Sequence, residues 1–337
     1  MAMPRFAADG VTDNTPAFAA VLADLTRQPD ATLDLTDGVY AISDTLELPT
    51  RVSLRMAPGA RILALPGFRG TAVVRKARGT KSEHVYSGRI AGGIVDGGGQ
   101  AVMGVHVPCA CRMDVSDVEV VDCTVRGIMI GDAEQGGWYE VNVSRVRCSV
   151  NKPLRHAPGS IGLQYLHCTD SLINMVVIIG YETGVWSQSG SNDFSQVHVW
   201  NHTENGPLQN CFVCRSWNDS WNQCYADSPF NGGQPCNGFL VDAPFNRFTA
   251  CRVYNNTMTI PDTVTGFLIT ERGTHGTYIG NHFTAHDGHA LKDAFAGPME
   301  AGTFIGNTYN PQVHGGLVNR IPSAEGGLSP VPALRIG

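Results

Sequence analysis

A repeat of about 27 residues constrains this chain more than any other feature. Short apolar strands recur at this step after Gly184 (GVWS), Cys211 (CFVC), Gly238 (GFLV) and Gly266 (GFLI). The segments NDFSQVHVWNHT at 192–203 and NRFTACRVYNNT at 246–257 are related by two such steps. A period of this size, built from strands and turns, predicts a solenoid, because one coil cannot bury its own apolar face.

The solenoid is expected to be a parallel β-helix over residues 31–315, an all-β fold whose coils stack about 4.8 Å apart. Apolar and polar residues alternate from residue 31 onward, which is typical of half-buried strands. Asparagines that recur at turns, Asn201 and Asn255, are expected to form side-chain ladders that satisfy backbone groups at the corners. Residues 316–337 have no strand period and are expected to form a C-terminal tail.

Residues 1–30 have a different pattern, with a turn followed by a short helix at 15–26. Thr12 or Asp13 can cap the helix, and Pro16 suits its first turn. Its apolar face is formed by Ala17, Phe18, Val21, Leu22 and Leu25. Because an open solenoid end exposes strand edges and core, this helix is expected to cap the first coil.

Composition excludes some partners. The formal net charge is −6 and no basic block is present, so nucleic acid is not expected as a partner. No apolar stretch approaches the length needed to span a membrane. The segment MAMPRFAADG has no apolar core of signal-peptide type, and cytoplasmic, secreted and virion-associated locations stay open. The ten cysteines lack the spacing of a zinc site and are predicted to be core residues, with disulfides as the alternative.

The segment DGVTDNTPAFAAVL at 9–22 resembles the N-terminal signature of the pectate-lyase-like β-helix superfamily, and GGIVDGGGQ at 92–100 resembles another stretch typical of that group. The resemblance implies a single-stranded right-handed parallel β-helix with an N-terminal capping helix. It also implies a carbohydrate-active protein, since the superfamily includes lyases, hydrolases, epimerases, fructan-transforming enzymes and phage tailspikes. The catalytic motifs of its polygalacturonase-type hydrolases are absent here, and so is a run of aspartates for a calcium site.

Strand alternation predicts which side chains face solvent. If Val185 points inward, Trp186 and Gln188 point outward, and Arg215 and Asp242 follow on neighbouring coils. An outward indole can stack on a pyranose ring, although a surface aromatic or a subunit interface gives the same pattern. Trp186, Gln188 and Arg215 are therefore the candidates to bind sugar.

Three carboxylates are the catalytic candidates, because a glycosidase needs two, about 5–5.5 Å apart for retention or about 6.5–9.5 Å for inversion. Counting coils places Asp132 and Glu182 about two coils apart, or roughly 10 Å. Glu182 and Asp242 are also about two coils apart. Glycosidic hydrolysis by Glu182 with Asp132 or Asp242 is the leading hypothesis, and a solvated turn residue is the alternative for each.

A longer step between strands at 127 and 162 indicates an extra loop that includes NKPLRHAPGS. Its cations, Lys152, Arg155 and His156, could hold an acidic sugar or, in a lyase, neutralise a uronate carboxylate. No metal site or other cofactor is predicted, because strand geometry separates the histidines in NHFTAHDGH by about 13 Å.

The sequence therefore predicts a carbohydrate-active enzyme that acts on a poly- or oligosaccharide in a groove along the coils, by hydrolysis. A polysaccharide lyase or another glycan-transforming enzyme is the second hypothesis. A non-catalytic glycan-binding or tailspike-type β-helix is the third, and its tailspike version would be a homotrimer.

Overall fold

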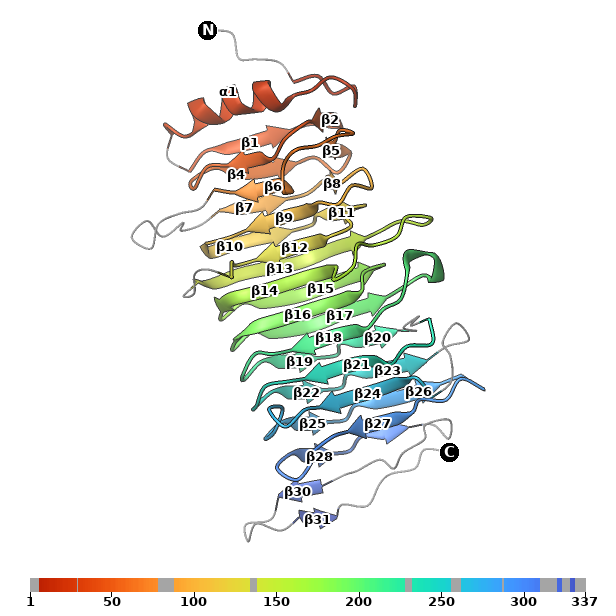
Figure 1. Ribbon diagram of the computed structural model, residues 1–337. Coiled ribbons are helices and arrows are strands. Elements are labelled where there is room, and N and C mark those ends of the chain that lie inside the picture. The colour runs from red at the N-terminus through yellow and green to blue at the C-terminus, as the bar shows by residue number, and fades with distance from the viewer. Residues whose placement is uncertain are drawn as a thin grey trace. The chain divides into compact units, whose positions relative to one another are not determined.

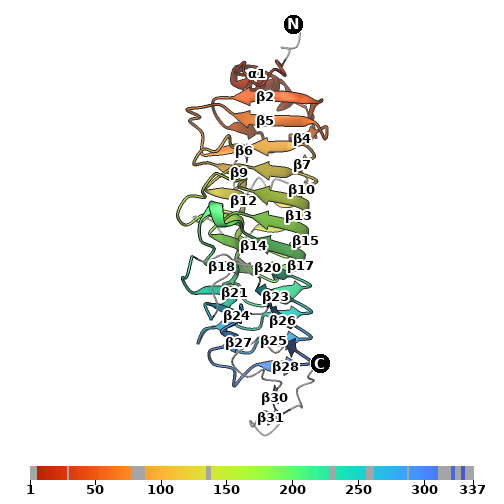
Figure 2. The ribbon, with the colours of Figure 1, turned by 90° about the vertical axis from the view of Figure 1, so that its right-hand side faces the viewer.

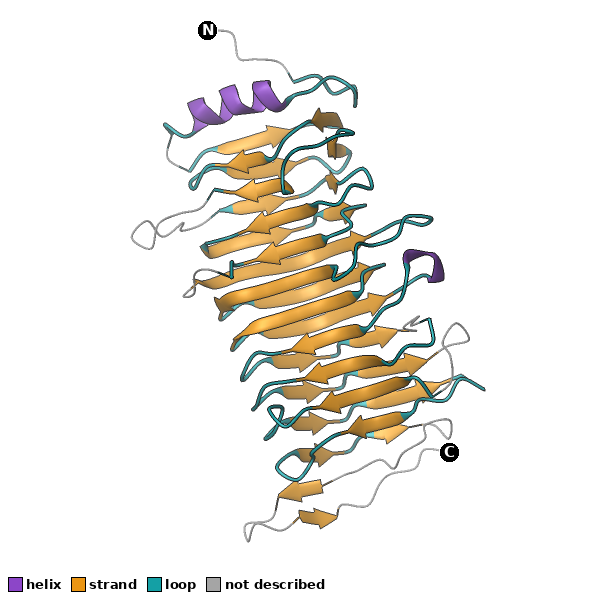
Figure 3. Cartoon of the chain, in the orientation of Figure 1, coloured by secondary structure: helices purple, strands orange, loops and turns teal. Residues whose placement is uncertain are grey.

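A computed structural model describes residues 6–28, 30–77, 88–133, 138–227, 232–255, 262–286, 288–309, 320–322 and 328–330. The chain divides into two compact units, Met1–Leu172 and Ile173–Gly337. Each unit is built almost entirely of short parallel strands, which stack coil upon coil (Figure 1; Figure 3). The predicted parallel β-helix is therefore confirmed.

The first unit has three sheets of parallel strands, and each coil contributes one strand to every sheet. One sheet contains β1 (Thr32–Leu35), β4 (Ser53–Met56), β7 (Arg89–Ala91), β10 (Cys111–Ser116) and β13 (Trp138–Ser149). Another contains β2 (Gly38–Ile42), β5 (Ala60–Ala64), β8 (Ile94–Asp96), β11 (Glu119–Val121) and the later part of β13. The remaining sheet contains β3 (Leu46–Leu48), β6 (Ala72–Lys76), β9 (Met103–Val107), β12 (Arg126–Ile130) and β14 (Ile161–Thr169).

The second unit is organised in the same way, and its sheets are numbered here in chain order. The first sheet contains β16 (Thr183–Gly190), β18 (Asn210–Cys214), β21 (Cys236–Val241), β24 (Val264–Ile269) and β27 (Asp293–Ala296). The second contains the start of β17 (Asp193–Trp200), then β19 (Ser220–Asn222), β22 (Arg247–Thr249), β25 (Thr277–Ile279) and β28 (Thr303–Ile305). The third contains the end of β17, then β20 (Tyr225–Asp227), β23 (Arg252–Asn255), β26 (His282–Ala285) and β29 (Thr308–Tyr309).

The described residues of the second unit hold three further strands and a short helix, and the first of these strands begins at Leu172, the last residue of the first unit. They are β15 (Leu172–Ile179), the 3-10 helix η1 (Thr203–Asn205), β30 (Arg320–Pro322) and β31 (Leu328–Pro330). The last two pair antiparallel with each other, and β30 pairs antiparallel with β28. Part of the expected tail thus forms strands, and the rest of 316–337 lies outside the described residues.

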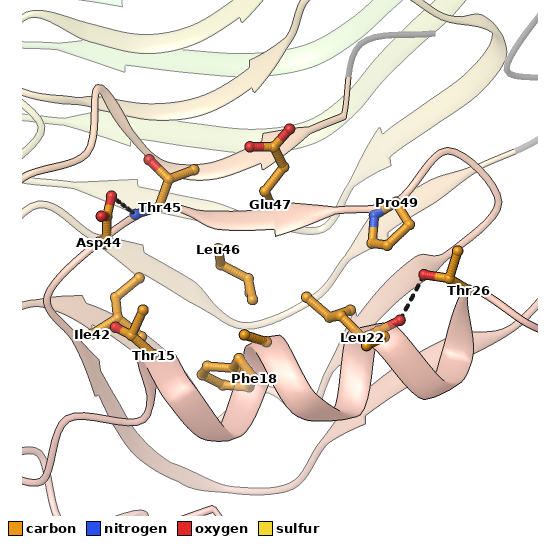
Figure 4. Close-up of a pocket in the computed structure, with 12 residues that line it drawn as sticks. Thr15, Phe18, Leu22, Thr26, Ile42, Asp44, Thr45, Leu46, Glu47 and Pro49 are labelled. Atoms are coloured by element: carbon orange, nitrogen blue, oxygen red, sulfur yellow. Dashed lines mark hydrogen bonds between the residues drawn. The ribbon is translucent and has the colours of Figure 1, made fainter.

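The predicted helix is α1 (Thr15–Leu25), which lies at the N-terminal end of the first unit (Figure 2). Phe18 and Leu22 are buried and face β3 across a pocket of about 310 Å³ (Figure 4). Asp13 accepts a 2.9 Å hydrogen bond from the backbone N–H of Thr15 and one of 2.6 Å from Ser43 Oγ. The Asp13 carboxylate thus connects the start of the helix to the first coil.

In the second unit, residues one repeat step apart in the sequence are paired on neighbouring strands. Val185, Phe212, Phe239 and Phe267 are paired in succession on the first sheet, at the repeat step found in the sequence. A second stack on the adjoining sheet includes Phe194 and Trp221, whose ring centres are 3.9 Å apart and whose rings are nearly parallel. All ten cysteines are buried, which confirms the prediction that they are core residues. The interior is therefore a set of side-chain stacks that run from coil to coil.

The recurring asparagines satisfy backbone groups at the corners, as predicted, but an asparagine ladder is formed at other positions. Asn201 and Asn255 donate side-chain hydrogen bonds to loop carbonyls, those of Gly206 and His289. The inter-coil ladders are formed elsewhere: the backbone N–H of Asn281 donates to Asn307 Oδ1, at 2.9 Å. A recurring Asn at a turn did not by itself distinguish these two uses.

Candidate functional site

The outward face of the first sheet in the second unit carries the predicted sugar-binding residues. On β16, Val185 and Ser187 are buried, Trp186 is half-buried and Gln188 is exposed. This is the alternation expected for a strand with one face on the core. The outward position of Trp186 is in register with Val213 and then with Leu240.

Beside these strands lies a groove of about 390 Å³. Its walls include Leu240 and Leu268 from the sheet and Leu208, Gln209, Gln234 and Pro235 from the connecting loops. Leu240 and Leu268 are half-buried, and both are paired in the register position of Trp186 and Val213. The outward face of this sheet is therefore hollowed on the side where the loops enter it.

Trp186 contacts one neighbour on the next coil and one on its own strand. The guanidinium carbon of Arg215 lies 4.5 Å from the centre of the indole ring, in cation–π geometry. The indole N–H donates a 3.2 Å hydrogen bond to Gln188 Oε1. The three predicted sugar-binding residues of this unit thus form one connected group.

Asp242 adds a carboxylate to the same group. Its Oδ2 lies 3.1 Å from Arg215 Nε and 3.7 Å from Arg272 Nη1, and its Oδ1 accepts a 2.7 Å hydrogen bond from Thr270 Oγ1. The side chain of Asp242 is 13% exposed, whereas those of Arg215 and Arg272 are 40% and 72% exposed. We call Trp186, Gln188, Arg215, Asp242, Thr270 and Arg272 the Arg215 surface.

The backbone fixes the positions of these side chains. The backbone N–H of Arg215 donates to the carbonyl of Ser187 at 2.8 Å, and that of Asp242 donates to the carbonyl of Cys214 at 2.9 Å. These bonds continue the strand ladder by one residue into the turn. Gln188, Arg215 and Asp242 therefore occupy equivalent positions on three successive coils, about 4.8 Å apart.

A buried polar cluster lies at the same turn. Ser187 Oγ is 2.7 Å from both Ser216 Oγ and Asp219 Oδ2, and Asp219 is fully buried. Burial raises the pKa of Asp219 to about 6 from 3.8, although hydrogen bonds from Asn192, Ser187 and Ser216 oppose the shift. Because Asp219 has no exposed surface, its carboxylate supports the turn and cannot contact a bound substrate.

The structure does not bring Glu182 and Asp242 together. Glu182 precedes β16, six residues before Gln188, and Gln188 occupies the position on its coil that Asp242 has two coils later. Six residues of strand separate the two carboxylates by about 20 Å along the strand, besides the roughly 10 Å between those coils. This separation exceeds the range that either glycosidase mechanism uses, so these two carboxylates cannot act on one bond.

The remaining predicted residues belong to the first unit. Asp132 is half-buried just after β12. Lys152 and Arg155 are exposed in the predicted loop, and His156 is half-buried, with Nδ1 3.2 Å from the carbonyl oxygen of Ala157. Asp132 and Glu182 lie in different units.

Sequence reasoning missed a row of titratable residues on the outward face of the third sheet in the second unit. His198, Tyr225, Arg252 and His282 are paired in succession from β17 to β26. His198 Nε2 lies 3.1 Å from Asp227 Oδ2, and the His198 ring stacks on Tyr225 at 4.8 Å. We call these four paired residues the His198 row.

Charge and burial act on this row. Burial raises the pKa of the Tyr225 hydroxyl, and Asp227 adds to that effect, while Arg252 opposes it. Burial lowers the pKa of His282, and the positive charge of Arg252 lowers it further. The sequence did contain a signal for these residues, because one repeat step separates His198 from Tyr225 and Tyr225 from Arg252.

The described residues were also compared with the requirements for a metal site and for a membrane-spanning helix. Among those residues, no group of three or more His, Cys, Asp or Glu side chains is arranged to hold a metal ion. None of the helices in the described parts of the chain has the length and apolar character needed to cross a membrane.

Comparison with known proteins gives structural matches only, since no protein-family profile and no curated protein sequence matches the chain. ORF18 of Geobacillus virus E2 aligns at a TM-score of 0.65 and 14% identity, over 93% of this chain and 61% of that one. An alginate lyase from Paenibacillus sp. aligns at 0.56 and 13%, over 82% and 99%. A tailspike protein of E. coli bacteriophage HK620 in complex with a pentasaccharide aligns at 0.58 and 12%, over 90% and 64%.

At these identities the likeness is one of fold. The chain spans about three fifths of the length of the viral ORF18 protein.

Proposed function

We propose that this chain is a carbohydrate-active protein and that its second unit binds a poly- or oligosaccharide on the Arg215 surface. One observation carries the proposal: Arg215 lies between an aromatic ring and a carboxylate, 4.5 Å from the Trp186 ring centre and 3.1 Å from Asp242. The structural neighbours, which include an alginate lyase and a tailspike bound to a pentasaccharide, support the same class of ligand.

The chemistry of the Arg215 surface suits a sugar. Carboxylate oxygens accept hydrogen bonds from sugar hydroxyls, and a guanidinium donates them in a fixed planar fork. Asp242 is held by Thr270 and two arginines, so its orientation is set before a ligand arrives. A preorganised polar group loses less side-chain entropy on binding. The groove lined by Leu240 and Leu268 offers apolar surface beside these polar groups.

The role we propose for Asp242 is substrate binding. Hydrolysis requires a second carboxylate within about 10 Å, and Glu182 lies too far along the strand to provide it. Asp132 belongs to the other unit, so its predicted pairing with Glu182 is not part of this proposal.

A second candidate function is β-elimination on a uronate, and the His198 row favours it. Elimination needs a base for the C5 proton, a proton donor for the leaving oxygen and a cation for the carboxylate. The His198 row contains these three groups. His198, which is hydrogen-bonded to Asp227, is the base, Tyr225 is the proton donor and Arg252 is the cation. A conjugated unsaturated product, detected by ultraviolet absorbance and lost in Tyr225→Phe, would support elimination.

A polysaccharide panel analysed by mass spectrometry tests the proposed function, with binding measured by calorimetry. Hydrolysis adds the mass of one water, elimination gives an unsaturated end, and a non-catalytic binder leaves the glycan unchanged. Asp242→Asn should weaken binding at least about tenfold, because it removes the negative charge and replaces one accepting oxygen by a donating NH2 group.

Asp117→Asn is the matched control. Asp117 pairs with Arg145 on the surface of the first unit, so its loss removes a similar ion pair elsewhere. Equal binding by wild type and Asp242→Asn would contradict the proposal.

A further inference from the structure

Two large aromatic side chains are exposed at the turn that follows the Arg215 surface. Trp217 is 59% exposed and Phe245 is 54% exposed. Among the described residues, the other large hydrophobic side chains that are exposed are aliphatic or Met: Val11, Leu172, Met175 and Ile279. Trp217 and Phe245 come from successive coils, so their exposure is a shared feature of this turn.

Both aromatics adjoin the Arg215 surface along the chain. Trp217 follows Arg215 by two residues, and Phe245 follows Asp242 by three. Trp217 forms a β-bridge with Gly190, and a Cβ atom at Gly190 would come within 2.9 Å of the Trp217 indole nitrogen. The absence of a side chain at Gly190 therefore leaves room for the ring of Trp217.

Phe245 has a backbone conformation that is unfavourable for a phenylalanine. Its φ is +62°, in the left-handed region, and the equivalent residues of other coils are Ser191, Asn218 and His275, with φ of +58°, +63° and +60°. A bulky residue is disfavoured in this region, whereas asparagine adopts it readily. Phe245 thus combines an unfavourable backbone with an exposed ring, which stacks on His275 at 5.4 Å.

We propose that Trp217 and the Phe245–His275 stack are platforms on which further sugar rings of the same chain stack. This inference rests on the proposed function and names the ligand more closely: an oligosaccharide that runs along the coils and presents the C–H face of a pyranose to each aromatic ring. From the coil of Trp186 to that of His275 is three coil steps, or about 14 Å. The site therefore takes several sugar units.

Sugar binding accounts for two features that folding alone disfavours: the left-handed backbone of Phe245 and the exposed rings of Trp217 and Phe245. Backbone strain and exposed aromatic surface are features that gather at binding sites. Each aromatic contact is expected to contribute about 0.5–1.5 kcal/mol, which corresponds to a factor of about two to ten in affinity.

Phe245→Asn is the most informative variant, because its effects on stability and binding are expected to have opposite signs. Asparagine occupies the equivalent position one coil earlier, at Asn218, so the variant should fold and have an unchanged or higher Tm. It should weaken binding of long oligosaccharides two- to tenfold and leave binding of the shortest binding oligosaccharide unchanged. Trp217→Ala should weaken long-chain binding similarly, and Ile279→Thr, at another exposed apolar residue, should have no effect.

The measurements are calorimetric titrations with an oligosaccharide length series, thermal unfolding, and sedimentation of the free protein. Unchanged binding of every length by Phe245→Asn and Trp217→Ala would overturn the inference, and the proposed function would stand if Asp242→Asn still weakened binding at least about tenfold. Self-association that both aromatic variants abolish would also overturn it, because the rings would then cover an interface between copies. Binding of no length by the wild type would overturn the proposed function as well.

Discussion

The backbone N–H of Asp219 donates a 3.0 Å hydrogen bond to Oδ1 of Asn246 on the next coil. The backbone N–H of Asn192 donates in the same way to Asp219 Oδ1, at 2.9 Å. Asp219 is thus the acidic member of a ladder whose neighbours are asparagines, and it is fully buried.

Asp219→Asn should stabilise the protein at neutral pH. Burial raises the pKa of Asp219 from 3.8 to about 6, so the folded state binds the proton more tightly than the unfolded chain does. The protonated Asp219 carboxyl group therefore contributes to the free energy of unfolding. This contribution is fully present below about pH 3.8 and is lost as the pH rises through about 6. The loss is of order 2–3 kcal/mol at pH 7. Urea unfolding at pH 4 and pH 7.5 measures it: the variant should be more stable only at pH 7.5. A variant less stable than wild type at both pH values would contradict this account of the ladder.

Asp13→Ala should have the opposite pH dependence. Burial alone would raise the pKa of Asp13, but hydrogen bonds from Ser43 and Thr15 together lower it to about 2. The stability that the carboxylate contributes is therefore present above pH 3.8 and is lost as the pH falls through about 2. The N-cap of α1 is Asn14 and not Thr12 or Asp13 as predicted, so Asp13 acts through its hydrogen bonds to Thr15 and Ser43. We expect a loss of about 0.5 kcal/mol at pH 7, because Asp13 is largely exposed. Thermal unfolding at pH 7 and pH 2.5 checks this, and an undiminished difference at pH 2.5 would count against it.

Trp221 and Trp217 should respond differently to truncation. Trp221 is fully buried between stacked rings, whereas Trp217 is 59% exposed. Trp221→Ala should cost about 3–5 kcal/mol in unfolding free energy, since it leaves a cavity. Trp217→Ala should change that free energy by no more than about 0.5 kcal/mol. Denaturant unfolding of the two variants compares the effects. A large loss of stability in Trp217→Ala would mean that its ring is a structural element and not a free platform.

The ten cysteines should be unreactive in the folded protein. All are buried, and burial raises the pKa of several thiols, including that of Cys168 to about 11. Because the thiolate is the reactive species, alkylation at pH 8 should be negligible without denaturant. Mass spectrometry after iodoacetamide treatment counts modified thiols, with ten expected in denaturant. Rapid labelling of any cysteine in buffer alone would reveal a region that opens readily.

The repeat step was enough to predict the fold, because residues one step apart in the sequence are stacked on neighbouring coils throughout a solenoid. The same step brought Gln188, Arg215 and Asp242 to equivalent positions, since one repeat separates each from the next. The pairing of Glu182 with Asp242 failed because a count of coils gives distance along the stack but ignores position along the strand. The ladder positions could not be predicted, because Asn246 and Asn255 both recur at turns and only the backbone around each decides its hydrogen bonds.

A crystal structure with a bound oligosaccharide, chosen from the panel by affinity, tests the central claim most directly. The account predicts sugar hydroxyls within hydrogen-bond distance of Arg215 and Asp242, and a pyranose ring stacked on Trp217 or Phe245. A sugar bound instead along His198, Tyr225 and Arg252, with the Arg215 surface empty, would contradict it.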